Sequence, residues 1–365
     1  MKILIVAPFD SKGRYSGGIS SIVNTLCDSG KLQEKNVKVL KFNTCQISRS
    51  NATEARLNFQ NLKNTFLIFI KLPRTIIAEE PDTIYFHTSL GMALLIDCMI
   101  IRNVKKQFPN VKIVVHIHFA DYVKIMPSKE VFRHFILLVL EKYTDKIVFL
   151  SEKTKEEFIK NGIDRDKATV IYNFSTMSFD EDCLRKSGTN VLKYLFVGTL
   201  SHRKGIFDIL SALNYVHGDY EFHICGDFLK AETKAAYLKA ISGIEEKIFY
   251  HGFVKGEEKK HIFSDCDILL LPSYAEGLPV AILEGYSAGC AIIASNVGAI
   301  PEIVKMQNGI IVKPGDINGL AFAIQEYLDA GRHSLSKQQY TNYIESFRYS
   351  IDAFADSVFD ICYRE

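Results

Sequence analysis

The sequence has 365 residues, which is long for one hydrophobic core and sufficient for two α/β domains. Apolar residues make up 47% and charged residues 24%, a composition that excludes an intrinsically disordered chain. Lysine and arginine total 44 and aspartate and glutamate total 42, so the net charge of +2 gives no ground for nucleic-acid binding.

The cysteines and the apolar runs indicate the compartment. Eight cysteines are spread along the chain without a C-x-x-C pair, and most lie in apolar runs such as 222–225. This pattern indicates buried thiols in a reducing compartment rather than a disulfide framework or a zinc site. Residues 1–8 predict a short strand. They do not predict a signal peptide, because their apolar run is too brief for one. No apolar stretch approaches the ~20 residues of a membrane span. We therefore expect a cytoplasmic protein.

Short β-branched runs alternate with longer helical patterns along the whole chain. The predicted strands are 3–6, 37–42, 83–87, 111–118 and 146–150, then 193–197, 220–225, 247–250, 267–271, 291–295 and 310–312. Apolar runs spaced by helices are typical of parallel strands covered on both faces. Each half therefore predicts a doubly wound parallel sheet of the Rossmann type.

A polar, turn-rich segment over 174–190 separates the halves. We expect one Rossmann-like domain over 1–175, a second over 190–337, and a helical tail over 338–365 that packs back on the N-terminal domain. Ligands of open α/β sheets bind at the carboxyl ends of the strands. We therefore expect the two domains to face each other across a cleft that these ends line.

The loop after the first predicted strand carries Gly17 and Gly18 just before a helix. Adjacent glycines let the backbone approach a ligand closely, and a helix N-terminus favours an anion. The loop lacks a G-x-G-x-x-G pattern, so a phosphate contact and a plain turn are equally good interpretations.

Two histidines lie near the end of the predicted strand 111–118. The alternation of a strand sends His116 and His118 to the same face. A core role is the better interpretation for His116. His118 lies nearer to the carboxyl end and is the candidate for the cleft.

The loop after the strand 193–197 runs from Gly198 through Arg203 and Lys204 into a helix. Two cations at a helix entrance oppose the preference of the helix dipole for negative charge. A phosphate group at this place explains them, because arginine offers a forked contact and lysine a point charge. A solvated basic turn is the weaker hypothesis.

The segment 272–285 is the most informative. Glu276 lies in the loop before a helix whose first turn suits Pro279, and Glu284 lies about a turn and a half inside that helix. Apolar neighbours surround Glu284, so its carboxylate needs partners. Ribose hydroxyls would suit Glu284, and sugar hydroxyls would suit Glu276.

Glu276 and Glu284 are separated by seven residues, a spacing that resembles the E-x7-E motif of retaining glycosyltransferase family four. The resemblance covers nearly the full length of the chain. The other matching residues are Gly17, Gly18, His118, Asn173, Arg203, Lys204, Gly205, Gly226 and Asp227. The resemblance implies the GT-B fold, with an acceptor-side N-terminal domain and a nucleotide-sugar-binding C-terminal domain.

The resemblance also implies roles for individual residues. Arg203, Lys204 and the backbone of the two glycines would bind the donor diphosphate, and His118 would lie near the reacting centre. The expected catalytic residues are His118, Glu276, Arg203 and Lys204. The expected donor-binding residues are Gly17, Gly18, Gly198, Arg203, Lys204, Gly277, Leu278, Pro279 and Glu284. Neither a metal nor a cofactor is implied.

Three further features of the sequence have interpretations other than donor binding. Asp265-Cys266-Asp267 spells D-x-D, a metal-binding pattern in other transferases, but it opens a strand at the wrong end for the cleft. The run 255–260 predicts a solvated helix start. The stretches 62–77 and 131–143 are apolar helices with basic flanks. They favour core packing, and the alternative is contact with the inner face of a membrane.

The sequence thus predicts a retaining, metal-independent hexosyltransferase that uses a UDP-sugar rather than a GDP-sugar. Its acceptor is a hydroxyl of a glycan or lipid-linked glycan, in the synthesis of a cell-surface polysaccharide, O-antigen or capsule. A sugar-nucleotide 2-epimerase of the same fold is an alternative that needs further acid and base residues. A non-catalytic sugar-binding subunit is another, and the presence of Glu276 and Lys204 argues against it.

Overall fold

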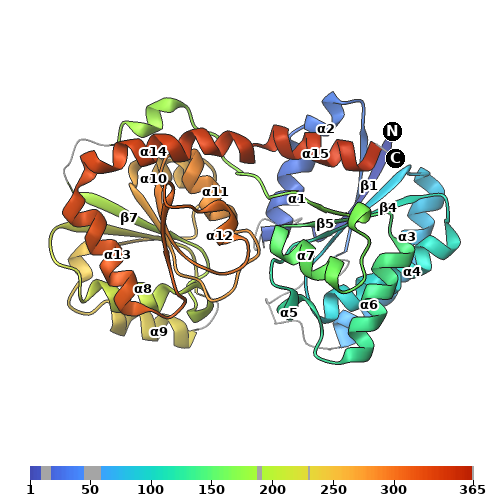
Figure 1. The fold of residues 1–365 in the computed structure, drawn as a ribbon, viewed down its shortest axis with the longest axis horizontal. Helices are drawn as coiled ribbons and strands as arrows, with labels where there is room; N and C mark the ends of the chain where they lie inside the picture. The colour runs from blue at the N-terminus through green and yellow to red at the C-terminus, as the bar shows by residue number, and fades with distance from the viewer. Residues whose placement is uncertain (10–17, 45–58, 187–190, 229–230, 364–365) are drawn as a thin grey trace. The chain divides into compact units, whose positions relative to one another are not determined.

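The computed structural model describes residues 1–9, 18–44, 59–186, 191–228 and 231–363. The chain divides into two compact units (Figure 1). The first unit comprises Met1–Phe174 with Ile351–Glu365, and the second comprises Ser175–Ser350. Each unit contains one six-stranded sheet.

The sheet of the first unit has the order β2-β1-β3-β4-β5-β6, and every neighbouring pair is parallel. Its strands are β1 (Lys2–Ala7), β2 (Lys38–Asn43), β3 (Thr83–Thr88), β4 (Lys112–Ile117), β5 (Lys146–Phe149) and β6 (Ala168–Val170). Its helices are α1 (Gly18–Asp28), α2 (Lys31–Glu34), α3 (Phe59–Glu79), α4 (Met92–Gln107), α5 (Tyr122–Ile125), α6 (Glu130–Tyr143), α7 (Glu152–Lys160) and α15 (Ile351–Tyr363). The winding direction reverses between β1 and β3, which makes their carboxyl ends a topological switch point.

The sheet of the second unit has the order β12-β11-β10-β7-β8-β9, again with parallel neighbours only. Its strands are β7 (Leu192–Val197), β8 (Tyr220–Cys225), β9 (Ile248–Gly252), β10 (Ile268–Leu271), β11 (Ala291–Ser295) and β12 (Gly309–Val312). Its helices are α8 (Ile206–Leu213), α9 (Ala231–Ala240), α10 (Gly256–Asp265), α11 (Val280–Ser287), α12 (Ile300–Ile303), α13 (Ile317–Ala330) and α14 (Arg332–Ser346). This is the strand order of a dinucleotide-type Rossmann sheet, with its switch point between β7 and β10.

The predicted doubly wound parallel sheets are confirmed, and every predicted strand is present with its ends shifted by at most two residues. The strand β6 was missed. It has only three residues, all partly exposed, at the edge of the sheet. A strand of three half-buried residues has neither an apolar run nor a full alternation of apolar and polar residues. A sequence pattern therefore does not reveal it.

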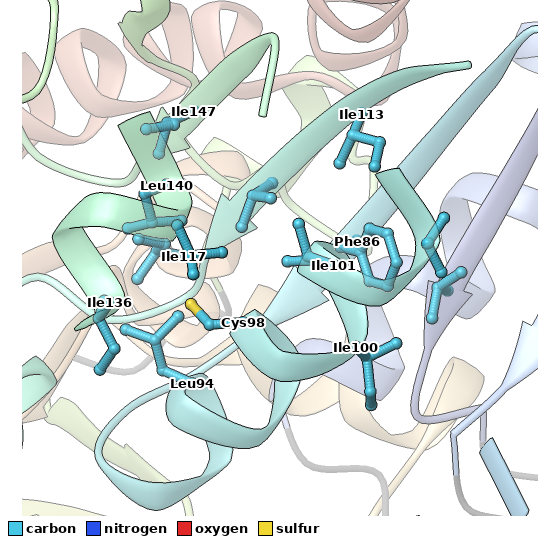
Figure 2. Close-up of a cluster of buried hydrophobic side chains, with 14 of the residues drawn as sticks. Phe86, Leu94, Cys98, Ile100, Ile101, Ile113, Ile117, Ile136, Leu140 and Ile147 are labelled. Carbon is cyan, nitrogen blue, oxygen red and sulfur yellow. The ribbon is translucent and has the colours of Figure 1, made fainter. Parts of the chain in front are cut away.

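The core of the first unit lies between its sheet and the helices α4 and α6. Figure 2 shows Phe86 and Ile117 from strands and Leu140 from a helix as members of this buried layer. All three side chains are buried. Full burial of such a side chain contributes about 1.5–3 kcal/mol. In Figure 1, α1, α2 and α15 gather on the other side of the same sheet, so both of its faces are covered.

The tail expected over 338–365 is divided between the units. The part from Ile351 onward belongs to the first unit, as expected, and the part before Ile351 belongs to the second, which corrects the expectation for that part. The helix α14 packs on α11 in the second unit, and α15 packs on α2 in the first. The physical reason is burial of apolar side chains in different units, since α14 buries Leu335 and Tyr343 in the second and α15 buries Phe354, Ala355, Val358 and Cys362 in the first. Polar contacts accompany this packing. The side-chain amide of Asn342 donates to the carbonyl of Cys290 at 2.8 Å, and Lys31 Nζ lies 2.9 Å from a carboxylate oxygen of Asp352.

Two properties of the helices concern contact with membranes. Among the described residues, the helices are all too short or too polar to cross a bilayer. The helix α3 exposes Phe66 and Ile77, with Lys71 and Arg74 between them. Contact of this face with a membrane surface stays a prediction.

The cysteines that the structure describes are buried free thiols, and Cys45 lies outside the described residues.

A close backbone approach joins the loops after β7 and β10. Gly205 has a φ of 75° and separates the 3-10 turn His202–Lys204 from α8. A Cβ atom at Gly205 would lie 2.3 Å from the carbonyl oxygen of Pro272. Only glycine permits both the left-handed backbone and this separation. The loops after β7 and β10 are therefore held at a fixed distance from each other at this contact.

We predict that Gly205→Ala destabilises the second unit far more than Gly252→Ala. Gly252 has a similar φ of 68°, but a Cβ there would meet no atom within 4 Å. Both variants incur the left-handed penalty of about 1–2 kcal/mol, and only Gly205→Ala adds a backbone clash. Calorimetric unfolding should show the larger drop in Tm for Gly205→Ala, at roughly 2–4 °C per kcal/mol. Equal shifts for the two variants would contradict this account.

Candidate functional site

The switch point of the second unit brings together two loops that the sequence singled out. β7 and β10 pair in parallel, with Ile268 opposite Tyr194. The loops 198–205 and 272–279 leave their carboxyl ends. Since consecutive crossovers depart in opposite directions at this point, the two loops border the crevice in which such sheets bind ligands.

An ion pair joins the two loops. Lys204 Nζ lies 2.6 Å from Glu276 Oε1, and the side chains are only 18% and 8% exposed. Shielding from water strengthens the attraction between the two charges. An ammonium group has three N–H donors and a carboxylate has two acceptor oxygens. Within the described parts of the chain neither group has a second partner, so both can still bind a ligand.

Arg203 sits beside this pair and is also tied to the loop after β10. Its Nη1 donates to the carbonyl of Ala275 at 3.0 Å, and its own carbonyl accepts from the backbone N–H of Tyr274 at 2.9 Å. The side chain is exposed, and most of its N–H donors have no partner among the described residues. Arg203 and Lys204 together form a cationic site at the entrance of α8, suited to an anion with several oxygens.

The other predicted donor-binding residues of this unit shape the same two loops. Gly198 comes so close to Gly226 that a Cβ on Gly226 would lie 1.8 Å from the Gly198 carbonyl oxygen. The carbonyl of Gly277 accepts from the backbone N–H of Ala299 at 2.9 Å. Leu278 is buried. These contacts fix backbone positions, and they leave the contacts with a donor as a prediction.

The sequence predicted that Pro279 lies in the first turn of α11. It lies one residue before that turn instead. Its ψ of 121° is extended, and α11 begins at Val280. The carbonyl of Pro279 accepts from the backbone N–H of Ile282 at 3.1 Å. A residue that accepts this first bond while its own backbone is extended caps the helix, and proline loses no hydrogen bond there.

Glu284 has the partners that its burial demands, but they are protein groups. Its side chain is 2% exposed, and Lys259 Nζ lies 2.6 Å from Oε1 and 2.7 Å from Oε2. The hydroxyl of Thr176 donates to Oε1 at 2.5 Å. The run 255–260 is therefore not wholly a solvated helix start, because Lys259 points inward. Contact of Glu284 with a ribose stays a prediction.

The residues of the D-x-D pattern form ion pairs and hydrogen bonds at the entrance of β10, away from these loops. Asp265 pairs with Lys193 Nζ at 2.6 Å. Asp267 is fully buried and accepts from the backbone N–H of Lys193 at 2.9 Å and from Arg332 at 2.6 Å. Both carboxylates therefore anchor the amino ends of strands.

The remaining predicted residues belong to the first unit. Gly17 lies outside the described residues, and Gly18 is the exposed first residue of α1. His118 directly follows β4, and its backbone N–H donates to the carbonyl of Thr88 at 2.9 Å. Its side chain is 8% exposed. The structure thus brings His118 to the carboxyl end of the sheet, as the sequence predicted.

Sequence reasoning missed the group around His118. His87 of β3 lies opposite His116 of β4 in the parallel register. His87 Nδ1 lies 2.7 Å from His118 Nε2, and the Tyr85 hydroxyl lies 2.8 Å from His116 Nδ1. Burial lowers the pKa of His118 to about 3 and the pKa values of His87 and His116 well below their usual range. All three imidazoles are therefore neutral near pH 7.

These three histidines are also the group with metal-ligand spacing among the described residues, since one ring nitrogen from each lies within 4.8 Å of the others. The family resemblance implies no metal. Two nitrogens on one tetrahedral zinc stand about 3.3 Å apart, given Zn–N bonds of about 2.0–2.1 Å. The 2.7 Å between His87 Nδ1 and His118 Nε2 is a hydrogen-bond distance instead.

Comparison with known families gives two adjoining matches. Residues 18–175 match the model of Glycosyltransferase Family 4, and residues 185–345 match the model of Glycosyl transferases group 1. The boundary between the matches coincides with the boundary between the two units.

Two relatives illustrate the range of similarity. An uncharacterized 41.2 kDa protein in the cps region of Klebsiella pneumoniae is 23% identical over 83% of this chain and 84% of its own length. The lipopolysaccharide 1,6-galactosyltransferase of Escherichia coli K12 is 25% identical over 54% of this chain and 56% of its own length. The chain therefore spans about half of that galactosyltransferase.

Solved structures share the fold over the whole chain. The Anabaena protein HepE in complex with UDP is 18% identical with a TM-score of 0.71, covering 99% of both chains. The lipopolysaccharide outer core galactosyltransferase WaaB, without ligand, is 18% identical with a TM-score of 0.73, covering 99% of this chain and 98% of that one. At this identity the likeness establishes the two-domain GT-B fold.

Proposed function

We propose that this chain, which belongs to the GT-B glycosyltransferases, transfers a sugar from a UDP-sugar to a hydroxyl group of a glycan with retention of anomeric configuration. The observation that carries the proposal is the Lys204–Glu276 ion pair beside Arg203 at the switch point of the second unit. The choice of donor is supported by HepE, whose structures contain UDP and UDP-glucose.

The cations account for departure of the nucleotide. When the bond between the sugar and the diphosphate breaks, negative charge grows on the phosphate oxygens. Preorganised cations stabilise such charge without reorganising at the moment of reaction. Arg203 and Lys204 lie together at the entrance of α8 and supply two positive charges there. This role makes a bound metal unnecessary in our mechanism.

Glu276 connects the diphosphate to the sugar. One of its carboxylate oxygens accepts from Lys204, and the other has no partner among the described residues. The free oxygen suits a hydroxyl of the donor sugar, while Lys204 keeps donors for a phosphate oxygen. The ion pair thereby aligns the two ends of the bond that breaks, and such alignment lowers the barrier.

A retaining outcome needs either a nucleophile from the protein or attack by the acceptor on the face that the leaving group occupies. A carboxylate bonded to an ammonium group is a weak nucleophile, and no better one is evident in the two described loops. We therefore favour attack by the acceptor on the face that the diphosphate leaves, with the departing phosphate taking the acceptor proton. A neutral His118 would hydrogen-bond near the sugar, since a pKa of about 3 makes it a poor base.

Two relatives support a class of acceptor. The Klebsiella relative lies in a cps region, and the E. coli relative is a lipopolysaccharide galactosyltransferase. Both support a glycan or lipid-linked glycan acceptor in cell-surface polysaccharide synthesis.

Nucleotide binding tests the proposal. In calorimetric titrations with EDTA present, UDP should bind more tightly than GDP, and added Mg²⁺ should leave the affinity unchanged. Arg203→Ala and Lys204→Ala should each lose about 1.5–3 kcal/mol, the value of a charge-assisted hydrogen bond. The matched control is Lys337→Ala, because Lys337 is an exposed lysine of α14 in the same unit.

Unchanged UDP affinity in both Arg203→Ala and Lys204→Ala would remove the diphosphate from this site. Binding that EDTA abolishes and Mg²⁺ restores would instead show that a metal carries the charge. Tighter binding of GDP would contradict only the choice of donor.

A further inference from the structure

We propose that His87 is a positioning residue that holds His118 in the tautomer with its proton on Nδ1. The tautomer is a property of the free protein. Its effect on turnover rests on the proposed function, in which His118 lies near the reacting sugar.

The sheet itself places the two rings together. Phe86 of β3 faces the core with α4 and α6, so the next residue, His87, faces the opposite layer. His116 of β4 faces the same layer, because its ring stacks near Phe354 of α15 at 6.2 Å. His118 lies two residues further on and therefore returns to this face. The parallel register sets His87 opposite His116, and His87 also reaches His118 just beyond the end of β4.

The His118 ring is held by one hydrogen bond and by stacking contacts with the rings of His87 and His116. Its Nε2 lies 2.7 Å from His87 Nδ1. Its ring stacks on His116 with centroids 4.0 Å apart and planes at 25°. His116 is held in turn through Nδ1 by the hydroxyl of Tyr85. Among the described residues, His87 is the hydrogen-bond partner of the His118 ring, and Nδ1 is the nitrogen left for a ligand.

The direction of the hydrogen bond follows from the other nitrogen of His87. Its Nε2 is buried and has no partner among the described residues. If His87 accepted from His118, this Nε2 would carry a proton and bury an N–H with no acceptor. Orphaned buried N–H groups are the rarer kind of unsatisfied group. We infer that His87 carries its proton on Nδ1 and donates it to Nε2 of His118.

This direction decides what His118 offers to a substrate. A neutral imidazole that accepts at Nε2 carries its proton on Nδ1. His118 therefore presents an N–H donor at the carboxyl end of the sheet, suited to an oxygen of the donor sugar. Without His87, both tautomers would be populated, and the Nε2–H form would present a lone pair to that oxygen.

The test uses two substitutions of His87 in the full chain. His87→Asn keeps a donor close to the position of Nδ1, and His87→Phe keeps a ring without one. Nitrogen-15 NMR of the histidine side chains distinguishes the tautomers directly. We expect the Nδ1–H form of His118 in the wild-type protein and in His87→Asn, and a mixture in His87→Phe. The control is His134→Phe, since His134 is exposed on α6 of the same unit.

Kinetics supply the second readout. His87→Phe should lower kcat roughly 3- to 10-fold, the equivalent of one hydrogen bond, with KM for the donor little changed. His87→Asn should restore most of the loss, which a purely structural role of His87 would not predict.

The wild-type spectrum alone can overturn the proposal, so it does not depend on the folding of any variant. A His118 proton on Nε2, or a tautomer unchanged in His87→Phe, would contradict the positioning role. Zn²⁺ that raises the Tm of the wild type but not of His87→Asn would show a metal site in its place. A changed tautomer with normal turnover in His87→Phe would leave the tautomer assignment intact and remove His118 from the reaction.

Discussion

The ion pair between Lys204 and Glu276 is the interaction on which the candidate site depends. Each side chain is a charge shielded from water, and without an opposite charge beside it that charge would destabilise the fold. The Rossmann order of the second sheet makes the pair possible, because β7 and β10 are far apart in sequence and adjacent in space. A ligand with phosphate oxygens at one end and hydroxyls at the other satisfies both partners at once.

Backbone packing then sets the precision of this arrangement. Gly205 lets the loop after β7 touch Pro272 of the loop after β10. Gly298 lets its own segment approach the loop after β10 equally closely, since a Cβ at Gly298 would lie 2.4 Å from the carbonyl oxygen of Glu276. Side chains on loops held in this way keep their geometry before a ligand arrives, and that reduces the entropy lost on binding. In the first unit, stacked neutral imidazoles give His118 a comparable rigidity.

The sequence predicted what depends on local pattern. Apolar runs located the parallel strands, and the glutamate spacing led to Glu276 and Glu284. It could not predict partners that only the folded chain brings together. Lys259 and Thr176 reach Glu284 from 25 and 108 residues away. His87 meets His118 through the register of β3 and β4, which the separate strand patterns do not specify. The short edge strand β6 and the division of the C-terminal tail likewise depend on tertiary contacts.

The most direct measurement of the central claim is the anomeric configuration of the sugar that the enzyme releases. Proton NMR can follow a UDP-α-sugar in the presence of the protein and distinguish the first product, transferred or hydrolysed, before it equilibrates. We predict an α product from the wild-type chain and greatly slowed formation of it in Glu276→Gln. A β product would contradict attack on the face that the diphosphate leaves. An undiminished rate in Glu276→Gln would contradict the role of the ion pair.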